Sequence, residues 1–507
     1  MPNEAFREYN AVLKDFSKID IAFGLCYPST YRSGMTGLAI HLFYSALNNR
    51  DDTSCERYFR YDTKSPANSV ESGRPLRDNH IVGFSLTYEE NIIELVQMLE
   101  KGGIPVGQSE RTDDDPIVLV GGPVVSANPE PYVDFIDAFV IGEGDIVIHK
   151  IVDVVGNAES RRDAIESLAE IEGVYVPSIP QNKIVRLIMK DFDSLFHPTA
   201  QVVADVEEGS KLESVFGQSL LVEVSRGCGH SCKFCLVGHI CRPRRTRSIS
   251  KLKAIIEKGV QETPVKKVSL IASSLGDLDN LEELASWVID QDLQLSTPSV
   301  RADRVTPNLL KIMKKAGQRT LTIAPETGSS RLRKEMGKGL DDEGIFSAVR
   351  YAHEADIGSL KTYFIIGLPG ETEEDVLAIG KMVKKLALET GMRITVNVNP
   401  FIPKAHTRWE REAQPTLEVL RSKIKIIQQS LHNVPRVRIE TLDPRNARVQ
   451  AALSVGDRSI GRVIRVAASY GGLSGWRRAE RETGVRFFEI ANDSSRKSEP
   501  LPWKSIE

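Results

Sequence analysis

Residues 220–235 read LLVEVSRGCGHSCKFC, so an apolar run leads directly into three closely spaced cysteines. Cys228, Cys232 and Cys235 are separated by three and then by two residues. Thiolates are the usual ligands of iron–sulfur clusters, and a four-iron cluster held by only three of them leaves one iron open to a substrate. The spacing therefore predicts a metal or redox site rather than a disulfide framework.

Downstream of this stretch, apolar runs alternate with helical stretches such as 250–260 and 373–388. The six runs cover residues 220–224, 268–272, 293–295, 320–323, 360–366 and 394–398. Strand–helix units of this kind predict an open or partial parallel barrel over residues 216–412. The cysteines follow the first strand, so we expect them at the C-terminal face of the barrel, where barrel enzymes form their active sites.

Upstream, a second alternating series begins near residue 20. Its apolar runs cover residues 21–25, 81–86, 117–120 and 138–141, and glycines follow the last two. This pattern predicts an α/β fold in which residues 1–155 form a Rossmann-like, doubly wound parallel sheet. Residues 156–215 are predicted to be a connector with a little β structure. Residues 413–507 are predicted to be a mostly helical extension that binds substrate or only closes the barrel.

The cysteine motif, with the aromatic residue Phe234 before its last cysteine, resembles the radical S-adenosylmethionine (SAM) superfamily. The resemblance implies that Cys228, Cys232 and Cys235 hold a [4Fe–4S] cluster and are the catalytic and metal-ligating residues. It further implies that the open iron takes the amino and carboxylate groups of SAM and delivers an electron to its sulfonium. The implied product is a 5′-deoxyadenosyl radical, which can break an unactivated C–H bond.

A zinc site is the alternative interpretation of the cysteines, with Cys241, His230 or His239 as the fourth ligand. Structural zinc sites take four protein ligands, commonly as two closely spaced pairs. A triad spaced by three and then two residues does not match that pattern, so we expect Cys241 to be an ordinary thiol. Cys26 and Cys55 are likewise expected to be inert thiols.

The resemblance continues along the predicted barrel. The positions that bind SAM in the family are matched, in chain order, by Phe234, Ser273, Ser274, Ser299, Arg301, Glu326 and Gly367. Ser273 and Ser274 replace the Gly-Gly-Glu run that is usual in the family, which puts the contact to the SAM amino group in doubt. The planar guanidinium of Arg301 is suited to a carboxylate because it can donate to both oxygens.

The N-terminal half resembles the cobalamin-binding domain that precedes the barrel in one subgroup of radical SAM enzymes. The matched positions are Tyr31, Gly34, Ser85, Thr87, Gly121, Gly122, Pro123, Gly142, Glu143 and Gly144. Glycine allows a cofactor to approach the backbone closely because it lacks a β-carbon. Tyr31 stands where some cobalamin domains carry a cobalt-ligating His, so the lower axial His is absent. The alternative is a scaffold or partner-binding domain without cobalamin.

These resemblances identify the chain as a cobalamin-dependent radical SAM C-methyltransferase that methylates an unactivated carbon. In the implied reaction, one SAM methylates cob(I)alamin and a second SAM yields the adenosyl radical that removes hydrogen from the substrate. The substrate radical then takes the methyl group. We expect a protein or peptide substrate, and residues 448–458 look like archaeal members of the subgroup. One candidate is a glutamine Cα in the α subunit of methyl-coenzyme M reductase.

Three other functions remain open. A methylthiotransferase of the same superfamily would need three further cysteines upstream, where only Cys26 and Cys55 occur. A rearrangement or ring closure would use the N-terminal domain as a scaffold without cobalamin. A zinc-stabilised binding module would have no catalytic activity.

Composition limits the partners. Lys and Arg number 66 against 69 Asp and Glu, which gives a net charge of −3 and disfavours nucleic-acid binding. The basic run 242–247 could bind phosphate, lie on a solvated loop, or, as we expect, act within the molecule near the active site. No apolar run approaches the roughly 18 residues of a membrane span. We therefore expect a cytoplasmic enzyme without membrane contact, whose electron donor the sequence does not identify.

Overall fold

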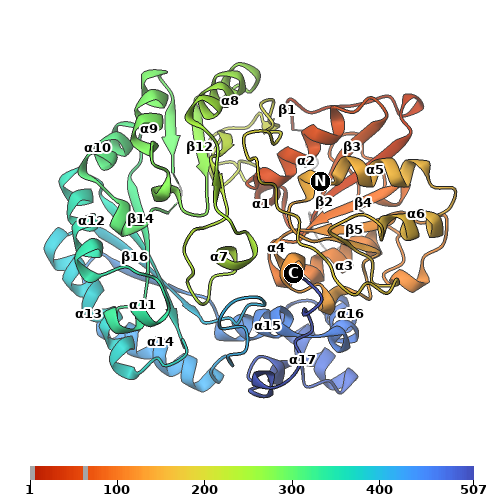
Figure 1. Ribbon diagram of the computed structural model, residues 1–507. Helices are drawn as coiled ribbons and strands as arrows, with labels where there is room; N and C mark the ends of the chain where they lie inside the picture. The colour runs from red at the N-terminus through yellow and green to blue at the C-terminus, as the bar shows by residue number, and fades with distance from the viewer. Residues whose placement is uncertain (1–5, 61–66, 298) are drawn as a thin grey trace.

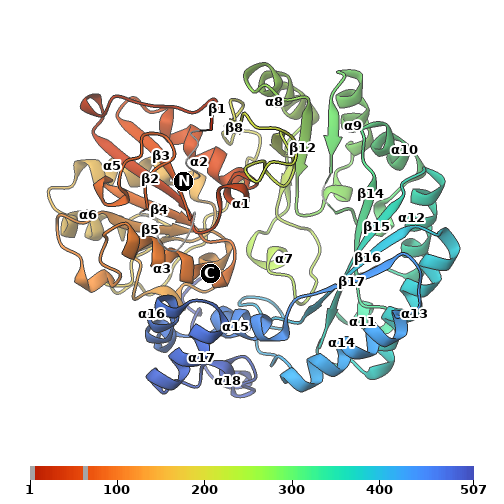
Figure 2. The same cartoon turned by 180° about the vertical axis from the view of Figure 1, so that it is seen from behind.

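The computed structural model describes residues 6–60, 67–297 and 299–507. An N-terminal α/β unit and a barrel unit face each other, and helices from the C-terminal part lie along one side of both (Figures 1 and 2). The short helix α7 (Val237–Ile240) lies between the two units. Strand ends of the N-terminal sheet and of the barrel unit lie close together there, where they line one cavity.

The N-terminal unit is built on a six-stranded sheet in the order β3-β2-β4-β5-β6-β7. Its strands are β2 (Ile21–Tyr27), β3 (Thr53–Phe59), β4 (Ile81–Ser85), β5 (Ile117–Gly121), β6 (Ala138–Val140) and β7 (Val174–Tyr175). All neighbours are parallel except β6 and β7. Helices α2 (Leu38–Asn48) and α5 (Ile148–Asn157) pack on one face, and α3 (Ile92–Lys101) packs on the other. The predicted doubly wound sheet is thus confirmed.

Two strands of this sheet lie outside the sequence prediction. Strand β3 has the sequence TSCERYF, which does not read as an apolar run, yet all seven residues are buried. Burial is possible because the Arg57 guanidinium pairs with both Glu8 and Glu71, at 2.6 Å each. Strand β7 and helix α6 (Arg161–Leu168) belong to this unit although they fall in the predicted connector.

The barrel unit contains two parallel sheets, in the orders β9-β12-β13 and β14-β15-β16-β17. The strands are β9 (Leu220–Glu223), β12 (Lys267–Ile271), β13 (Gln294–Ser296), β14 (Thr320–Glu326), β15 (Ser359–Ile366), β16 (Arg393–Pro400) and β17 (Val437–Thr441). The six predicted strands are all present. No strand pair joins β13 to β14 within the described residues, so the barrel is open as expected.

The seventh strand, β17, comes from the extension that was expected to be mostly helical. It pairs in parallel with β16 from Ile394↔Val437 to Val398↔Thr441. Its sequence VRIET alternates polar and apolar residues and is only partly buried, as befits an edge strand.

Helices cover the outer face of the barrel strands. They are α8 (Ile249–Glu262), α9 (Leu281–Asp290), α10 (Pro307–Lys315), α12 (Asp342–Glu354), α13 (Glu373–Thr390) and α14 (Leu417–Leu431). Most begin at a Ser, Thr or Asp whose side chain accepts a backbone N–H, as Thr372 does at α13. None of the described helices has both the length and the apolar character of a membrane span.

The C-terminal helices α15 (Pro444–Val455), α16 (Gly461–Tyr470) and α17 (Gly472–Thr483) bind both units together. Gln97 of α3 donates to the Ala468 carbonyl at 2.7 Å, and Asn128 donates to the Gly456 carbonyl at 2.8 Å. Trp476 is buried and stacks on Phe487 at 4.7 Å, so this aromatic residue packs a small core.

Candidate functional site

The three cysteines lie on a loop whose two ends are paired. Strand β10 (Ser225–Arg226) is antiparallel to β11 (Arg245–Thr246), and we call residues 227–244 between them the cysteine loop. Gly227 begins this loop with φ +80°, and a β-carbon there would lie 2.0 Å from the Cys241 carbonyl oxygen. The middle of the loop is fixed by the backbone N–H of Lys233, which donates to the Met336 carbonyl at 2.9 Å.

The thiols lie beside charged groups that the motif itself does not include. Cys232 is buried, whereas Cys228 and Cys235 are partly exposed. Burial raises the pKa of the Cys232 thiol, and the cations Lys338 and Arg301 offset part of that rise. Burial also raises the pKa of Cys235. The positive groups favour the thiolate form that a metal ligand requires.

The donor set fits a three-thiolate cluster. Among the described residues, no three or more His, Cys, Asp or Glu side chains converge on a site for a single metal ion. A four-iron cluster does not need such a site, because each thiolate binds a different iron.

Among the fourth ligands proposed for zinc, His230 has another side-chain partner, whereas the Nε2 atom of His239 is buried without a hydrogen-bond partner among the described residues. The His230 Nε2 atom lies 2.8 Å from Asp277 Oδ2, and the His239 Nδ1 atom lies 2.7 Å from the Cys235 carbonyl oxygen. The Cys241 thiol lines a different cavity, described below. The spacing of the three cysteines, rather than these contacts, favours the cluster over zinc.

A cavity of about 390 Å³ lies beside the cysteine loop at the carboxyl ends of β14, β15 and β16, and we call it the barrel cavity. Phe234 and Glu326, both predicted to contact SAM, line it. The Glu326 carboxylate pairs with Lys338 Nζ at 2.8 Å, and Arg301 donates to the Lys338 carbonyl at 3.1 Å. Lys338 thus joins two of the predicted residues, a role that its sequence position did not indicate.

The other predicted SAM residues are more scattered. Ser273 lines a second cavity, Ser274 is buried, and Ser299 is exposed. Gly367 does not line the barrel cavity. Its N–H donates to Glu371 at 2.6 Å, and a β-carbon would lie 2.8 Å from Leu420. Gly367 thus forms a packed turn, and the structure does not bring it to the barrel cavity.

The second cavity, of about 410 Å³, lies between the two units, and we call it the interdomain cavity. It contains eight of the predicted cobalamin positions: Ser85, Thr87, Gly121, Gly122, Pro123, Gly142, Glu143 and Gly144. These residues follow the carboxyl ends of β4, β5 and β6, where open parallel sheets bind ligands. The barrel side contributes Gly227, Cys241 and Ser273, so the cavity reaches the cysteine loop.

The glycines of this cavity are needed at their positions for different structural reasons. Gly122 has φ +114°, and a β-carbon would lie 2.5 Å from the Leu86 carbonyl oxygen. Gly142 has φ +99°, and a β-carbon would lie 2.3 Å from the Leu187 carbonyl oxygen. Both are required by contacts within the protein. At Gly121 a β-carbon would meet only Val140, at 3.8 Å, so this glycine alone fits the expected role of leaving room for a ligand.

Tyr31 and Gly34, both predicted to contact cobalamin, do not line the interdomain cavity. The Tyr31 hydroxyl donates to Glu8 at 2.5 Å, and its ring packs edge-on against Phe59. A β-carbon on Gly34 would lie 2.3 Å from the Phe59 ring. The chain turns at Gly37 before α2 begins, so side chains of α2 face the cavity instead. Those are the apolar residues Leu38, Ala39, Leu42 and Phe43.

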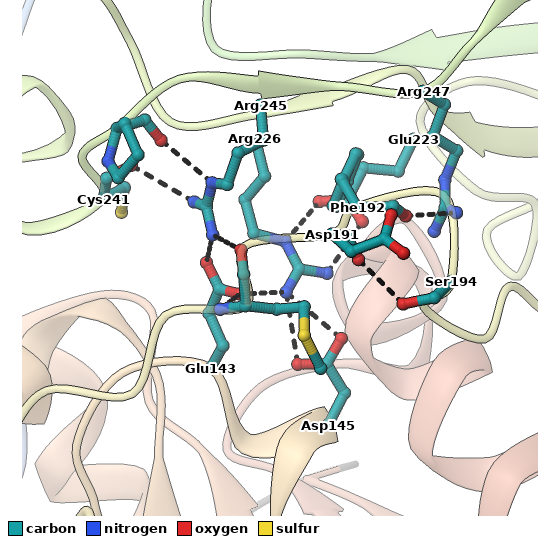
Figure 3. A network of polar contacts seen from close by, with 12 residues as sticks. Glu143, Asp145, Asp191, Phe192, Ser194, Glu223, Arg226, Cys241, Arg245 and Arg247 are labelled. Atoms are coloured by element: carbon teal, nitrogen blue, oxygen red, sulfur yellow. Dashed lines mark hydrogen bonds and ion pairs between the residues drawn. The ribbon is translucent and has the colours of Figure 1, made fainter.

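Ion pairs join the two units at the edge of the interdomain cavity. Figure 3 shows the carboxylates of Glu143 and Asp145 directed at the guanidinium groups of Arg226 and Arg245. Arg247 is buried and donates to the Phe192 carbonyl at 2.8 Å. The two arginines of the basic run 242–247 that are buried thus make contacts within the molecule, as the sequence analysis expected.

Comparisons with protein families agree with this geometry. The family described as "Radical SAM superfamily" matches residues 222–383, and the family described as "Radical SAM proteins, N-terminal" matches residues 39–177. The segment 222–383 contains the cysteine loop and the four barrel strands β12, β13, β14 and β15 that follow it. A radical SAM domain implies a [4Fe–4S] cluster and SAM, which agrees with the predicted cofactors.

Related proteins include one of nearly equal length. "Uncharacterized protein MJ0966" of Methanocaldococcus jannaschii is 29% identical over 442 residues, which cover 87% of this chain and 90% of that protein. "Uncharacterized methyltransferase PH0819" of Pyrococcus horikoshii is 26% identical, over 55% of this chain and 60% of its own. "Putative methylthiotransferase MJ0865" of M. jannaschii is 27% identical, and the match covers 57% of this chain and 60% of that protein.

Among solved structures, the fold is similar to that of TsrM from Kitasatospora setae, described as a radical S-adenosylmethionine methyltransferase. One TsrM structure, with tryptophan and a SAM analogue bound, has a TM-score of 0.52 at 14% identity and covers 92% of this chain and all of its own. Another, with cobalamin and a [4Fe–4S] cluster bound, has a TM-score of 0.51. At this identity the similarity concerns the fold. Residues 222–383, which contain the cysteine loop, match the radical SAM superfamily, and the chain as a whole is similar in fold to the TsrM structures.

Proposed function

We propose that the protein is a cobalamin-dependent radical SAM methyltransferase that methylates an unactivated carbon. The observation that carries this proposal is the interdomain cavity, which opens to both the N-terminal sheet and the cysteine loop. A cofactor in that cavity would lie next to the cluster loop without any change of fold. The TsrM structures, which have a similar fold and include one with cobalamin and the cluster bound, support the proposal.

The lining of the interdomain cavity suits a large amphipathic cofactor. One part is apolar and consists of side chains from β2, β5 and α2, such as Phe23, Leu119 and Leu42. The other part is polar and includes Ser85, Thr87 and the ion-paired edge. Binding sites for organic cofactors commonly combine an apolar lining with a few placed polar groups. This division favours a corrinoid over an empty scaffold domain.

In this proposal, Cys228, Cys232 and Cys235 hold the cluster, and residues around the barrel cavity hold SAM. When bound, the cluster and SAM would supply a radical that removes hydrogen, and cobalamin would supply the methyl group. The chain's own residues then position these groups and exclude water. Glu326 and Lys338 form a buried ion pair next to Cys232, which fixes polar groups where SAM would bind.

The substrate would have to reach the region between the barrel cavity and the interdomain cavity. All three parts of the chain meet there: Lys404 of the barrel unit forms an ion pair with Glu89 of the N-terminal unit, and Gln450 of α15 donates to Glu89 at 2.8 Å. We propose a protein or peptide substrate, with glutamine Cα in the α subunit of methyl-coenzyme M reductase as the first candidate. The resemblance of residues 448–458 to archaeal members supports that choice.

The experiment incubates the reconstituted enzyme with SAM, a reductant, hydroxocobalamin and peptides from methyl-coenzyme M reductase. We expect a peptide to gain the mass of one methyl group on carbon. S-adenosylhomocysteine and 5′-deoxyadenosine should form in equal amounts, because one SAM supplies the methyl group and another supplies the radical. Formation of 5′-deoxyadenosine without methylated peptide would exclude this substrate, and methylation that does not require cobalamin would exclude the reaction type.

A methylthiotransferase is the second candidate function, because several relatives carry that name. An auxiliary cluster in the N-terminal unit would need three cysteines there. The sequence provides only Cys26 and Cys55, and both are fully buried in neighbouring strands of the sheet. This observation disfavours the methylthiotransferase. A peptide that gained sulfur as well as a methyl group would reverse that conclusion.

A further inference from the structure

A group of buried charges connects the interdomain cavity to the cysteine loop. Glu143 and Asp145 come from the loop after β6, and Glu223, Arg226 and Arg245 come from the barrel unit (Figure 3). Their side chains are between 6% and 17% exposed. Four of the five, all except Arg245, also line the interdomain cavity. An occupant of that cavity would therefore contact the same groups that hold the two units together.

Glu143 is central to this group. Its Oε1 atom lies 2.6 Å from Arg245 Nη1, and its Oε2 atom lies 3.2 Å from Arg226 Nη1. Oε2 also accepts the Met189 N–H at 3.0 Å. One carboxylate thus contacts two guanidinium groups of the barrel unit and the backbone of the connector. The prediction that Glu143 binds cobalamin directly did not include these contacts.

The two arginines that contact Glu143 are themselves partners at the base of the cysteine loop. Arg226 and Arg245 are opposite each other in the β10–β11 pair, which closes the loop. Cys228 follows Arg226 by two positions. A shift of the Glu143 carboxylate would therefore be transmitted to both ends of the loop that carries the cluster ligands.

The remaining contacts make the arrangement stiff. Arg226 donates to both oxygens of Glu223, at 3.0 and 2.8 Å, and lies 3.1 Å from Asp145. Such two-pronged contacts fix the orientation of the guanidinium plane. Removal of one partner would leave a buried charge unpaired, which costs far more than the loss of a surface ion pair. We therefore expect the network to adopt one defined arrangement.

We propose that Glu143 is a positioning residue that couples the interdomain cavity to the cysteine loop. This inference rests on the proposed function, with a corrinoid in the cavity and SAM at the cluster. Binding of the corrinoid next to Glu143 sets the position of the loop and so changes the affinity for SAM. Because coupling between two binding sites is reciprocal, SAM must change the affinity for the corrinoid by the same factor.

The test uses the full-length protein with its cluster reconstituted and kept oxidised, so that SAM is bound but not cleaved. The Kd for SAM is measured without and with saturating hydroxocobalamin, and the Kd for hydroxocobalamin is measured without and with SAM. In the unaltered protein we expect both ratios to be at least about fivefold and equal to each other. In Glu143→Gln, which keeps the size of the side chain and removes its charge, we expect both ratios to fall to within about twofold.

A matched control is Glu130→Gln. Glu130 is also buried and pairs with Arg458 at 2.5 Å, but it joins the N-terminal unit to the C-terminal helices, away from the cysteine loop. This variant should keep the coupling of the unaltered protein. Asp145→Asn, which weakens only the contact to Arg226, should reduce the coupling in part. Iron content of each variant shows whether the protein and its cluster are intact.

The outcomes separate the inference from the proposed function. If the unaltered protein does not bind hydroxocobalamin, both are wrong. If it binds both ligands without coupling, or if Glu143→Gln keeps the full coupling, only the inference is wrong. An equal loss of coupling in Glu143→Gln and Glu130→Gln would also overturn the inference, because the break of any ion pair between parts of the chain would then have the same effect.

Discussion

At the scale of single residues, two adjacent glycines of the interdomain cavity should respond differently to the same substitution. Gly121→Ala adds a methyl group that meets only Val140 at 3.8 Å and projects where a ligand would lie. Gly122→Ala forces φ +114° on an L-residue and places the methyl group 2.5 Å from the Leu86 carbonyl oxygen. We expect Gly121→Ala to fold normally and bind cobalamin weakly. We expect Gly122→Ala to be destabilised by about 1–3 kcal/mol or more.

Urea denaturation and equilibrium dialysis with hydroxocobalamin check this pair of variants. The two variants add the same methyl group at adjacent residues, so each variant is the control for the other. If Gly121→Ala bound cobalamin as tightly as the unaltered protein, the cavity would not be the corrinoid site.

A buried histidine should make stability depend on pH. The His197 Nε2 atom accepts the Glu223 N–H at 3.1 Å, and burial lowers the pKa of His197 to about 3, from 6.5. Below pH 6.5 the unfolded chain therefore takes up a proton that the folded protein does not. The folded protein therefore loses stability as the pH falls below 6.5, and the loss is complete near the pKa of His197 in the folded protein. Between pH 7 and pH 5 it amounts to about 2 kcal/mol of unfolding free energy.

His197→Gln supplies the measurement. The amide oxygen can still accept from the Glu223 N–H but does not titrate between pH 7 and pH 5. We expect the decrease in unfolding free energy over this interval to be about 2 kcal/mol smaller in the variant than in the unaltered protein. Equal decreases would show that His197 takes up its proton in the folded state.

The sequence alone is enough to select residues whose pattern lies within a short stretch of the chain. The cysteine spacing, and the glycines that follow strands, are legible without knowledge of the fold. Lys338, Glu223 and Arg226 were missed because their importance comes from partners that folding brings near, such as Glu143, which is 102 positions from Arg245. The position of Tyr31 outside the cavity could not be read from the sequence, because the turn at Gly37 decides which helix faces the cavity.

At the scale of secondary-structure elements, strands with continuous apolar runs were predictable and mixed strands were not. β2, β4 and β5 are buried on both faces and read as apolar throughout. β3 contains Glu56 and Arg57, and its burial depends on ion pairs with distant residues. β17 is an edge strand with a partly exposed face, so its weak pattern could not be told from a turn.

The C-terminal tail is an element with a predictable contribution to stability. Ile506 forms a parallel β-bridge with Ile184. The Trp503 side chain is buried, with 2% of the residue exposed, and its indole N–H donates to Glu410 at 2.9 Å. Trp503→Ala should cost about 3–5 kcal/mol because it removes a large buried ring. Trp503→Phe keeps most of the ring and should cost about 1–3 kcal/mol, mainly for the lost hydrogen bond at Glu410.

Urea denaturation of both variants separates packing from hydrogen bonding. A loss of less than 1 kcal/mol in Trp503→Ala, on the order of a surface substitution, would show that the tail does not contribute to the stable fold.

At the scale of the whole molecule, the parallel strands of the two units present their carboxyl ends to one region, and the C-terminal helices pack against both units. The interdomain cavity and the barrel cavity both adjoin the cysteine loop. The alternating sequence pattern predicted each unit separately. It could not predict their relative placement, because the ion pairs and hydrogen bonds between the two units join residues up to 315 positions apart.

The most direct test of this account is the content of cobalamin and iron in protein purified without oxygen from cells supplied with cobalamin. The account predicts about one cobalamin and about four irons per chain. Iron without cobalamin would contradict it and leave a radical SAM enzyme whose N-terminal unit is a scaffold.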